Sequence, residues 1–289
     1  MIIISDKYGQ LGNQLFLFGH FIAVASEHRF VVANPAFDEY AQYFQATSDD
    51  LFCRYPHKTS YIRPTKMRRK LCYSTAKYST ILISKLKLGN RTFRAVVLET
   101  EKKYLLDSPE FLNLLKRATA LFIRGGLFRD PSNFEKHGDK IRAFFRPLRV
   151  IEDDVVSLVK KAREKCELLV GVHIRHGDYK DWGAGRYFYD VPTYVKLMHE
   201  VSTLFEGKKV GFLVCSDVVH DRGAFESLNY RFGNNHLIED MYAFAQCDYL
   251  IGPPSTYTMW ASFYGKVPLF VIDERDAVPT LKEFKVVTA

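Results

Sequence analysis

The sequence contains only five cysteines, and no two of them are close together in the sequence. Their number is odd and none belongs to a CxxC motif; they are Cys53, Cys72, Cys166, Cys215 and Cys247. No pair of Cys or His residues has the spacing of zinc ligands, so we expect no metal site. A chain of 289 residues buries enough apolar surface to fold without a disulfide or a metal. We therefore expect reduced, buried thiols in a cytosol-like compartment.

Long hydrophobic runs are also absent. No stretch approaches the roughly 18 uninterrupted apolar residues of a membrane-spanning helix. The N-terminal Met1-Ile2-Ile3-Ile4 favours a strand, and no basic region or small-residue cleavage site accompanies it. The composition, 47% hydrophobic and 26% charged, is typical of a soluble globular protein. We expect a cytoplasmic protein with no membrane span.

The chain has a formal net charge of +8, and one of its segments contains very few acidic residues. From Arg54 to Lys103 there are fourteen Lys or Arg, against Glu99 and Glu101 only. Residues 65–87 mix these charges with apolar side chains, which predicts a helix that packs on the protein. Three interpretations of this basic segment are open: a solvated helix face, a surface attracted to membranes or anionic acceptors, and a nucleic-acid-binding site. No nucleic-acid-binding fold is recognisable, so we expect no nucleic acid and retain peripheral membrane contact through residues 54–103.

Strands and helices alternate along most of the chain. Met1–Ser5, Asn13–Glu27 and Phe30–Ala33 follow the pattern of a βαβ unit, and the second half repeats such units. This alternation predicts an α/β fold with parallel sheets covered on both faces. Residues 147–152 are the expected boundary. It divides an N-terminal domain, 1–148, with a basic helical insertion at about 54–94, from a C-terminal domain, 149–289.

The polar cluster His173-Ile174-Arg175-His176-Gly177-Asp178-Tyr179 follows the apolar strand Leu168–Ile174. In open parallel sheets, ligands bind beyond the carboxyl ends of the strands. A guanidinium there stays charged and can hold two phosphate oxygens, so Arg175 is the candidate anion ligand. Asp178 either orients Arg175 or acts on substrate. The alternative is an ion pair that ties the strand to the loop.

Three further segments lie at strand-to-helix junctions. Ser255 or Thr256 caps a helix whose N-terminus can also bind an anion. Ser216-Asp217 follows the strand Val210–Cys215, and its carboxylate either accepts hydrogen bonds from a guanine or ribose or caps the next turn. Gly9–Gln14 is a weak phosphate-loop signal or a plain glycine turn between strand and helix.

Together these segments resemble the α-1,2-fucosyltransferase family (glycosyltransferase family 11), which is related to the α-1,6- and protein O-fucosyltransferases. The resemblance covers most of the chain, and residues 54–94 match least. It departs from the family at His176, where the HxRRGD pattern has a second Arg, and after Pro254, where Ser-Thr-Tyr-Thr-Met-Trp replaces a Ser-Ser-Phe-Ser-Trp-Trp-like stretch. Four motifs carry the resemblance: Gly9–Phe16, His173–Tyr179, Phe212–Asp217 and Asp248–Tyr257.

The resemblance implies a GT-B-like fold of two Rossmann-like halves with a cleft between them. It also implies a GDP-fucose donor, no metal or further cofactor, and inversion at the anomeric carbon. Arg175 would hold the diphosphate. The other implied donor-site residues are Gly12, Asn13, His173, Ser216, Asp217, Ser255 and Thr256.

The implied reaction is the transfer of fucose to a hydroxyl of a glycan or lipid-linked oligosaccharide, with galactose O2 as the expected acceptor atom. Arg175 would stabilise charge on the leaving diphosphate, and Asp178 or His176 would act as general base. Three alternatives remain: a transferase for another nucleotide sugar, a catalytically dead sugar-binding module, and a basic nucleic-acid-binding protein.

Overall fold

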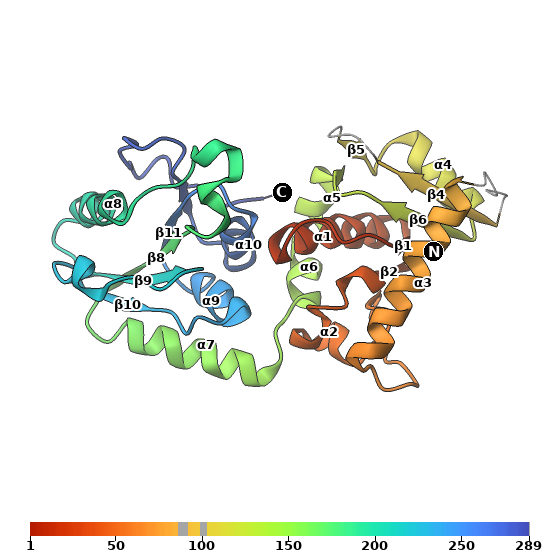
Figure 1. Cartoon of the computed structure of the whole chain (residues 1–289), viewed down its shortest axis with the longest axis horizontal. Helices are drawn as coiled ribbons and strands as arrows, with labels where there is room; N and C mark the ends of the chain where they lie inside the picture. Colours follow the sequence, from red (N-terminus) through yellow and green to blue (C-terminus); the bar gives the residue numbers. More distant parts are fainter. Residues whose placement is uncertain (86–91, 99–102, 289) are drawn as a thin grey trace. The chain divides into compact units, whose positions relative to one another are not determined.

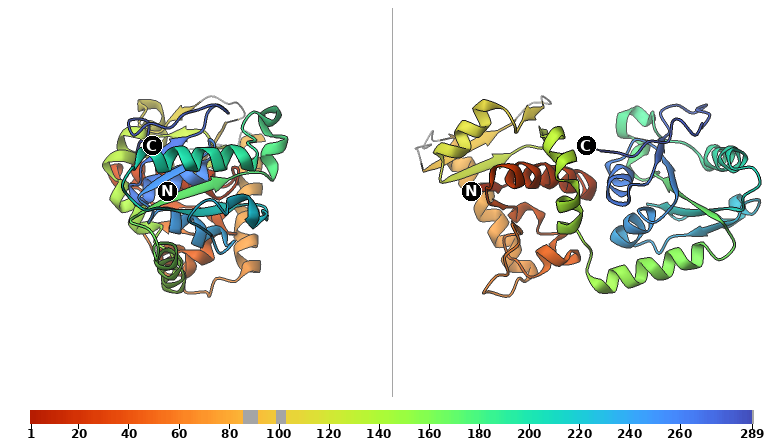
Figure 2. Two further views of the ribbon diagram at one scale, coloured as in Figure 1. Left: turned by 90° about the vertical axis from the view of Figure 1, so that its left-hand side faces the viewer. Right: turned by 180° about the vertical axis from the view of Figure 1, so that it is seen from behind.

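The computed structural model describes residues 1–85, 92–98 and 103–288. Glu99, Glu101 and the end of the predicted basic helix at 86–87 lie outside these residues. The chain divides into two compact units, Met1–Leu148 and Arg149–Val287, and Thr288 groups with the first (Figures 1 and 2).

The first unit is built on a five-stranded sheet of order β3-β2-β1-β6-β4. Its strands are parallel except for β3, which runs antiparallel to β2. A second sheet pairs β5 with β7 in parallel. The strands are β1 (Ile2–Ile4), β2 (Val32–Ala33), β3 (Arg54–Tyr55), β4 (Phe93–Val97), β5 (Tyr104–Leu105), β6 (Ala120–Arg124) and β7 (Phe128–Arg129).

The helices of the first unit pack around these sheets. They are η1 (Pro35–Phe37), η2 (Ala41–Tyr43), α1 (Leu11–His28), α2 (Gln45–Ser48), α3 (Lys66–Lys85), α4 (Pro109–Arg117), α5 (Pro131–Lys136) and α6 (Gly138–Phe144). Apolar residues that recur at helical spacing along α1, such as Phe18 and Ile22, are fully buried. The amphipathic pattern of residues 134–145 predicts one helix, and this prediction is wrong, because the chain leaves the helical conformation at His137 (φ −104°, ψ 16°) and starts α6 there.

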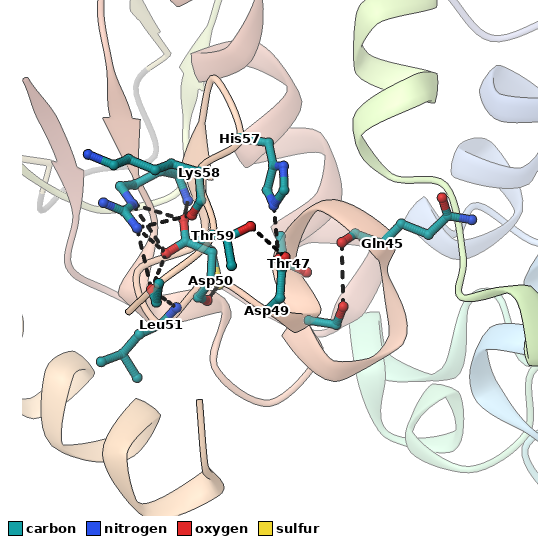
Figure 3. A network of polar contacts seen from close by, with 12 residues as sticks. Gln45, Thr47, Asp49, Asp50, Leu51, His57, Lys58 and Thr59 are labelled. Carbon is teal, nitrogen blue, oxygen red and sulfur yellow. Dashed lines mark hydrogen bonds and ion pairs between the residues drawn. The ribbon is translucent and has the colours of Figure 1, made fainter. Parts of the chain in front are cut away.

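A buried carboxylate organises the segment between α2 and α3. Asp50 is fully buried and accepts hydrogen bonds from Arg54 Nε at 2.9 Å, Arg54 Nη2 at 2.8 Å and Ser60 Oγ at 2.9 Å (Figure 3). Its neighbour Asp49 accepts from Thr59 Oγ1 at 2.8 Å and lies 2.9 Å from His57 Nε2. The two carboxylates therefore fix the loop from which α3 begins.

The second unit contains an all-parallel sheet of order β10-β9-β8-β11-β12. Its strands are β8 (Leu168–Ile174), β9 (Val210–Ser216), β10 (Tyr230–Phe232), β11 (Tyr249–Gly252) and β12 (Leu269–Val271). Its helices are α7 (Arg149–Ala162), α8 (Val191–Leu204), α9 (Leu237–Phe244), α10 (Thr256–Gly265), η3 (Asp178–Lys180), η4 (Trp182–Gly185) and η5 (Arg222–Phe225).

Helices cover both faces of this sheet, and β8 lies in its centre. Alternate residues of a strand point to opposite faces. Val172 and Ile174 join a buried cluster with Met198 of α8. On the other face, a Cβ added at Gly171 would lie 2.6 Å from the Phe244 ring of α9. The second unit is therefore a doubly covered parallel sheet, and the prediction of an α/β fold is confirmed.

None of the helices in the described ranges is long and apolar enough to cross a membrane.

Candidate functional site

Three of the predicted clusters lie together at one edge of the second sheet. β8 lies between β9 and β11, and all three strands are parallel, so their carboxyl ends share an edge. Ile174 is in register with Ser216, and a Cβ added at Gly252 would lie 3.0 Å from His173 Cβ. The segments after these strands, 175–179, 216–217 and 253–256, therefore begin side by side.

Asp217 joins two of these segments. One carboxylate oxygen accepts the backbone N–H of His176 at 2.9 Å, and the other accepts that of Gly177 at 2.9 Å. The second oxygen also lies 3.4 Å from Arg175 Nε. Asp217 therefore holds the turn at the exit of β8, not the turn that follows it in the chain, and its contact with a guanine or ribose stays a prediction.

Arg175 is held by two carboxylates. Its Nε donates to Asp178 Oδ1 at 2.8 Å and its Nη2 donates to Asp178 Oδ2 at 3.0 Å. Its guanidinium carbon lies 5.7 Å from the centre of the Tyr179 ring. The Arg175 side chain is largely buried, whereas half of the Asp178 side chain is exposed. An incoming anion could therefore replace Asp178 on a guanidinium whose direction is already fixed.

His176 has one ring nitrogen engaged. Its Nε2 lies 2.6 Å from the carbonyl oxygen of Tyr189, and a carbonyl only accepts hydrogen bonds. Nε2 therefore carries the proton, and the basic lone pair of the neutral ring is on Nδ1. The ring packs 4.6 Å from Phe188 and 5.0 Å from His220, centre to centre.

His173 is buried beneath the edge of the sheet, with an exposed fraction of 4%. Its ring lies 5.1 Å from that of Tyr257, and its Nδ1 is 3.5 Å from Thr258 Oγ1. Burial, reinforced by the charge of Arg175, lowers the pKa of His173 to about 3. His173 is therefore neutral at working pH and cannot supply positive charge to a phosphate.

The N-terminus of α10 is tied to the segment that follows β8. Ser255 caps α10 by accepting the Tyr257 N–H at 3.3 Å, and Thr256 is the first residue of the helix. The Tyr179 hydroxyl donates to the carbonyl oxygen of Pro254, and the Tyr179 ring stacks on Trp182 at 4.9 Å. This contact brings the helix N-terminus, with its free N–H groups, close to the loop of Arg175.

A cavity of about 210 Å³ opens beside Ser216 at the ends of β9 and β10. Asp240 of α9 lines it with an exposed fraction of 5%, and burial raises the pKa of Asp240 to about 6. One of its oxygens accepts the Asn234 N–H at 2.9 Å. His220 lies 2.8 Å from Ser216 Oγ through its Nε2. Sequence reasoning missed Asp240 and His220, and the only available signal was that His220 follows Ser216-Asp217 closely.

The remaining predicted residues, Gly12 and Asn13, belong to the first unit. They lie in the first turn of α1, which has no side-chain cap from Gln10 and no acidic residue. Gly9 has φ +61°, and a Cβ there would lie 2.4 Å from Asn13 Nδ2. The segment is therefore a glycine turn whose residue at position 9 must lack a side chain for Asn13 to pack.

Over residues 1–85, 92–98 and 103–288, no group of three or more His, Cys, Asp or Glu side chains is arranged to hold a metal ion.

No protein-family model and no curated protein sequence matches this chain. Solved structures do match. A mutant of Arabidopsis thaliana FUT1 in complex with GDP has a TM-score of 0.60 at 11% identity over 99% of this chain and 73% of that one. The fucosyltransferase NodZ from Bradyrhizobium has a TM-score of 0.54 at 14% identity over 94% and 95%.

POFUT1 in complex with GDP has a TM-score of 0.51 at 12% identity, covering 96% of both chains. At such identities the likeness establishes the fold and nothing further. The two α/β units of this chain have the GT-B-like fold of these fucosyltransferases.

Proposed function

We propose that this protein is an inverting fucosyltransferase that moves fucose from GDP-fucose to a hydroxyl of a glycan, with galactose O2 as the acceptor atom. The observation that carries the proposal is Arg175, fixed by Asp178 and Asp217 at the sheet edge where α10 begins. The shared fold supports the donor, because FUT1 and POFUT1 were solved with GDP and NodZ was soaked with GDP-fucose.

The leaving group explains the need for a fixed cation. When the bond between fucose C1 and the phosphate oxygen breaks, negative charge grows on the β-phosphate. Arg175 and the N–H groups at the start of α10 can absorb that charge without reorganising, so the reaction requires no metal. Ser255 and Thr256 add hydroxyls at the same helix end. Gly12 and Asn13, at the start of α1, are proposed to approach the same diphosphate.

We assign the guanine to the cavity beside Ser216. Guanine presents N1–H and N2–H₂, two donors that a buried carboxylate can accept, and Asp240 is such a group. Asp240 lines the cavity, whereas Asp217 lies against the backbone of His176 and Gly177, which favours Asp240 for the base and Asp217 for positioning Arg175. Ser216 and His220 would contact the nucleoside at the mouth of the cavity.

The general base becomes available when the diphosphate replaces Asp178 on the Arg175 guanidinium. In the described structure Asp178 occupies two guanidinium nitrogens, so both of its oxygens are already engaged. When the diphosphate takes these nitrogens, Asp178 is released. It then accepts the proton of the acceptor hydroxyl as that oxygen bonds to C1 and the C1–phosphate bond breaks. His176 can serve through Nδ1 only, since Nε2 donates to Tyr189.

The test is a donor screen with mass-spectrometric detection of the transferred sugar. GDP should raise the melting temperature, UDP and ADP should not, and GDP-fucose should be the donor used. Arg175→Lys keeps the charge but loses the two-pronged geometry, and we expect kcat to fall roughly 10²-fold, the scale of one lost oxyanion donor. Transfer from GDP-mannose or a UDP-sugar instead would establish the alternative of another nucleotide sugar. Near-normal turnover of Arg175→Lys would remove Arg175 from the mechanism.

A further inference from the structure

Helix α3 carries an apolar stripe that faces solvent. The exposed fractions of its four members are 80% for Met67, 66% for Leu71, 67% for Tyr78 and 54% for Leu82. They are spaced four, seven and four residues apart, which places them on one side of a helix of 3.6 residues per turn. Apolar side chains gathered in this way on a protein surface mark an interaction site more often than isolated ones do.

The protein fixes the direction in which this stripe points. Arg69 is buried and donates to the carbonyl oxygens of Thr47, Ser48 and Asp50, each at 2.8 Å. Further along, Thr80 is fully buried and donates to Ser5 Oγ at 2.7 Å. Arg69 and Thr80 lie on the opposite side of α3 from the stripe. Rotating the helix to bury the stripe would break both sets of hydrogen bonds.

Positive charge borders the stripe. Lys66 and Lys70 are exposed along one side of it, and Arg68 is exposed along the other. The sequence contains no Asp or Glu between Asp50 and Glu99, so no carboxylate within α3 offsets these charges. Figure 1 draws α3, in orange, along the surface of the first unit. The surface has an apolar stripe, interrupted by Ser74, with cations along both sides between Met67 and Leu82 and the exposed Lys85 at its C-terminal end.

We propose that α3 docks the protein on an anionic lipid bilayer, with the stripe of Met67, Leu71, Tyr78 and Leu82 buried at the headgroup boundary. Amphipathic helices bind membranes in this way, with apolar residues toward the acyl chains and Lys or Arg toward anionic headgroups. A nucleic-acid site would need cations along its centre to follow the phosphates. In α3 the centre is apolar, so a bilayer fits this surface better than a polynucleotide.

The inference concerns the first unit alone and holds whatever sugar the second unit transfers. The test is flotation of the full chain with vesicles of phosphatidylcholine, alone or with about 30 mol % phosphatidylglycerol, which carries the anionic charge. We expect binding to the anionic vesicles to be at least about tenfold tighter than to the neutral ones. GDP-dependent thermal stabilisation, measured on the same samples, reports separately on the proposed donor site.

Two variants separate the apolar and the cationic contributions. The first variant combines Met67→Ser, Leu71→Ser, Tyr78→Ser and Leu82→Ser. We expect its affinity for vesicles to fall at least about tenfold. Its melting temperature should equal that of the unchanged protein, because these side chains are exposed. Changing Lys66, Arg68 and Lys70 to Gln should cost about fivefold per charge, on anionic vesicles only. The matched control changes Val150 and Val156 of α7 to Ser; these side chains are 64% and 55% exposed and should leave binding unaltered.

Three results would overturn the proposal. The first is unchanged vesicle binding by the serine variant, since the stripe would then contribute nothing. The second is equal binding to neutral and anionic vesicles. The third is tight, salt-sensitive binding of RNA that the serine variant retains in full, which would mark α3 as a nucleic-acid surface instead.

Discussion

Asp217 and Gly177 are in contact across the exits of two neighbouring strands. The Gly177 N–H donates to Asp217 Oδ2 at 2.9 Å, and a Cβ at position 177 would lie 2.6 Å from that same oxygen. Real Cβ atoms essentially never come this close to another heavy atom. A side chain at position 177 would therefore displace the Asp217 carboxylate, which also contacts Arg175 Nε at 3.4 Å.

Gly177→Ala is the direct test of this contact. The added methyl group must displace the carboxylate of Asp217, which shifts Arg175 away from the diphosphate. We expect kcat to fall roughly 10- to 100-fold, because small misplacements of charge-stabilising groups are costly. Steady-state kinetics with GDP-fucose measure the effect. Gly183→Ala is the control for the added methyl group, which meets nothing within 4 Å there. Its φ of +57° adds backbone strain that Gly177, at φ −52°, does not have, so the control should lower stability while kcat stays unchanged.

Asp178→Asn separates anion binding from proton transfer. Asp178 occupies two nitrogens of Arg175, and its neutral replacement competes less well with a phosphate for them. We expect GDP to bind several-fold more tightly while kcat for fucose transfer drops about 10²-fold, the usual contribution of a general base. Calorimetry and turnover assays report the two changes. If GDP binding weakens and turnover is normal, Asp178 has a structural role only.

The position of these groups follows from the sequence to a large extent. The clusters after Ile174, Ser216 and Gly252 were recognisable because each ends an apolar run, and parallel strands bring their carboxyl ends to one edge. The strand Leu168–Ile174 was predicted with its observed bounds. Side-chain partners were less accessible. Asp217 is compatible with two roles in the sequence, and only the distances to the N–H groups of His176 and Gly177 show that it holds the turn after β8.

Clusters at strand ends do not reveal residues whose role depends on contacts with segments far away in the sequence. Asp240 lies within a helix, and nothing local shows that its side chain lines a cavity at the ends of β9 and β10. Arg69 stands in a run of basic residues and is indistinguishable from Arg68 by type or spacing. Its burial depends on three carbonyl groups about twenty residues earlier, a tertiary feature that helical periodicity does not contain.

Asp240 makes the stability of the second unit depend on pH. Its pKa is raised from 3.8 to about 6 in the folded protein, so folding favours the protonated form. This contribution to stability is present at about pH 4 and is lost as the pH rises through 6. Asp240→Asn removes the ionisation, and we expect it to raise the free energy of unfolding at pH 7 by about 1–2 kcal/mol.

The same substitution should weaken the proposed contact with guanine. Denaturant unfolding at pH 4 and pH 7 measures the stability change, and the GDP-induced shift in melting temperature measures binding. A variant that is more stable at pH 7 yet responds less to GDP fits both the raised pKa of Asp240 and its proposed contact with guanine. A variant that is less stable at pH 7 would show that the hydrogen bond from Asn234 to the carboxylate outweighs the cost of its burial.

Arg69→Met tests how α3 is held in the first unit. The substitution removes the donor for the carbonyl groups of Thr47, Ser48 and Asp50, all of which lie beneath the helix. Buried acceptors left without partners are costly, and we expect the free energy of unfolding of this unit to fall by about 3–5 kcal/mol. Arg68→Met, one position earlier and exposed, should change it by less than about 0.5 kcal/mol. Because the second unit has its own core, GDP-dependent stabilisation should survive in both variants. Its loss in Arg69→Met would mean that GDP binding depends on the first unit, through coupled unfolding or through Gly12 and Asn13.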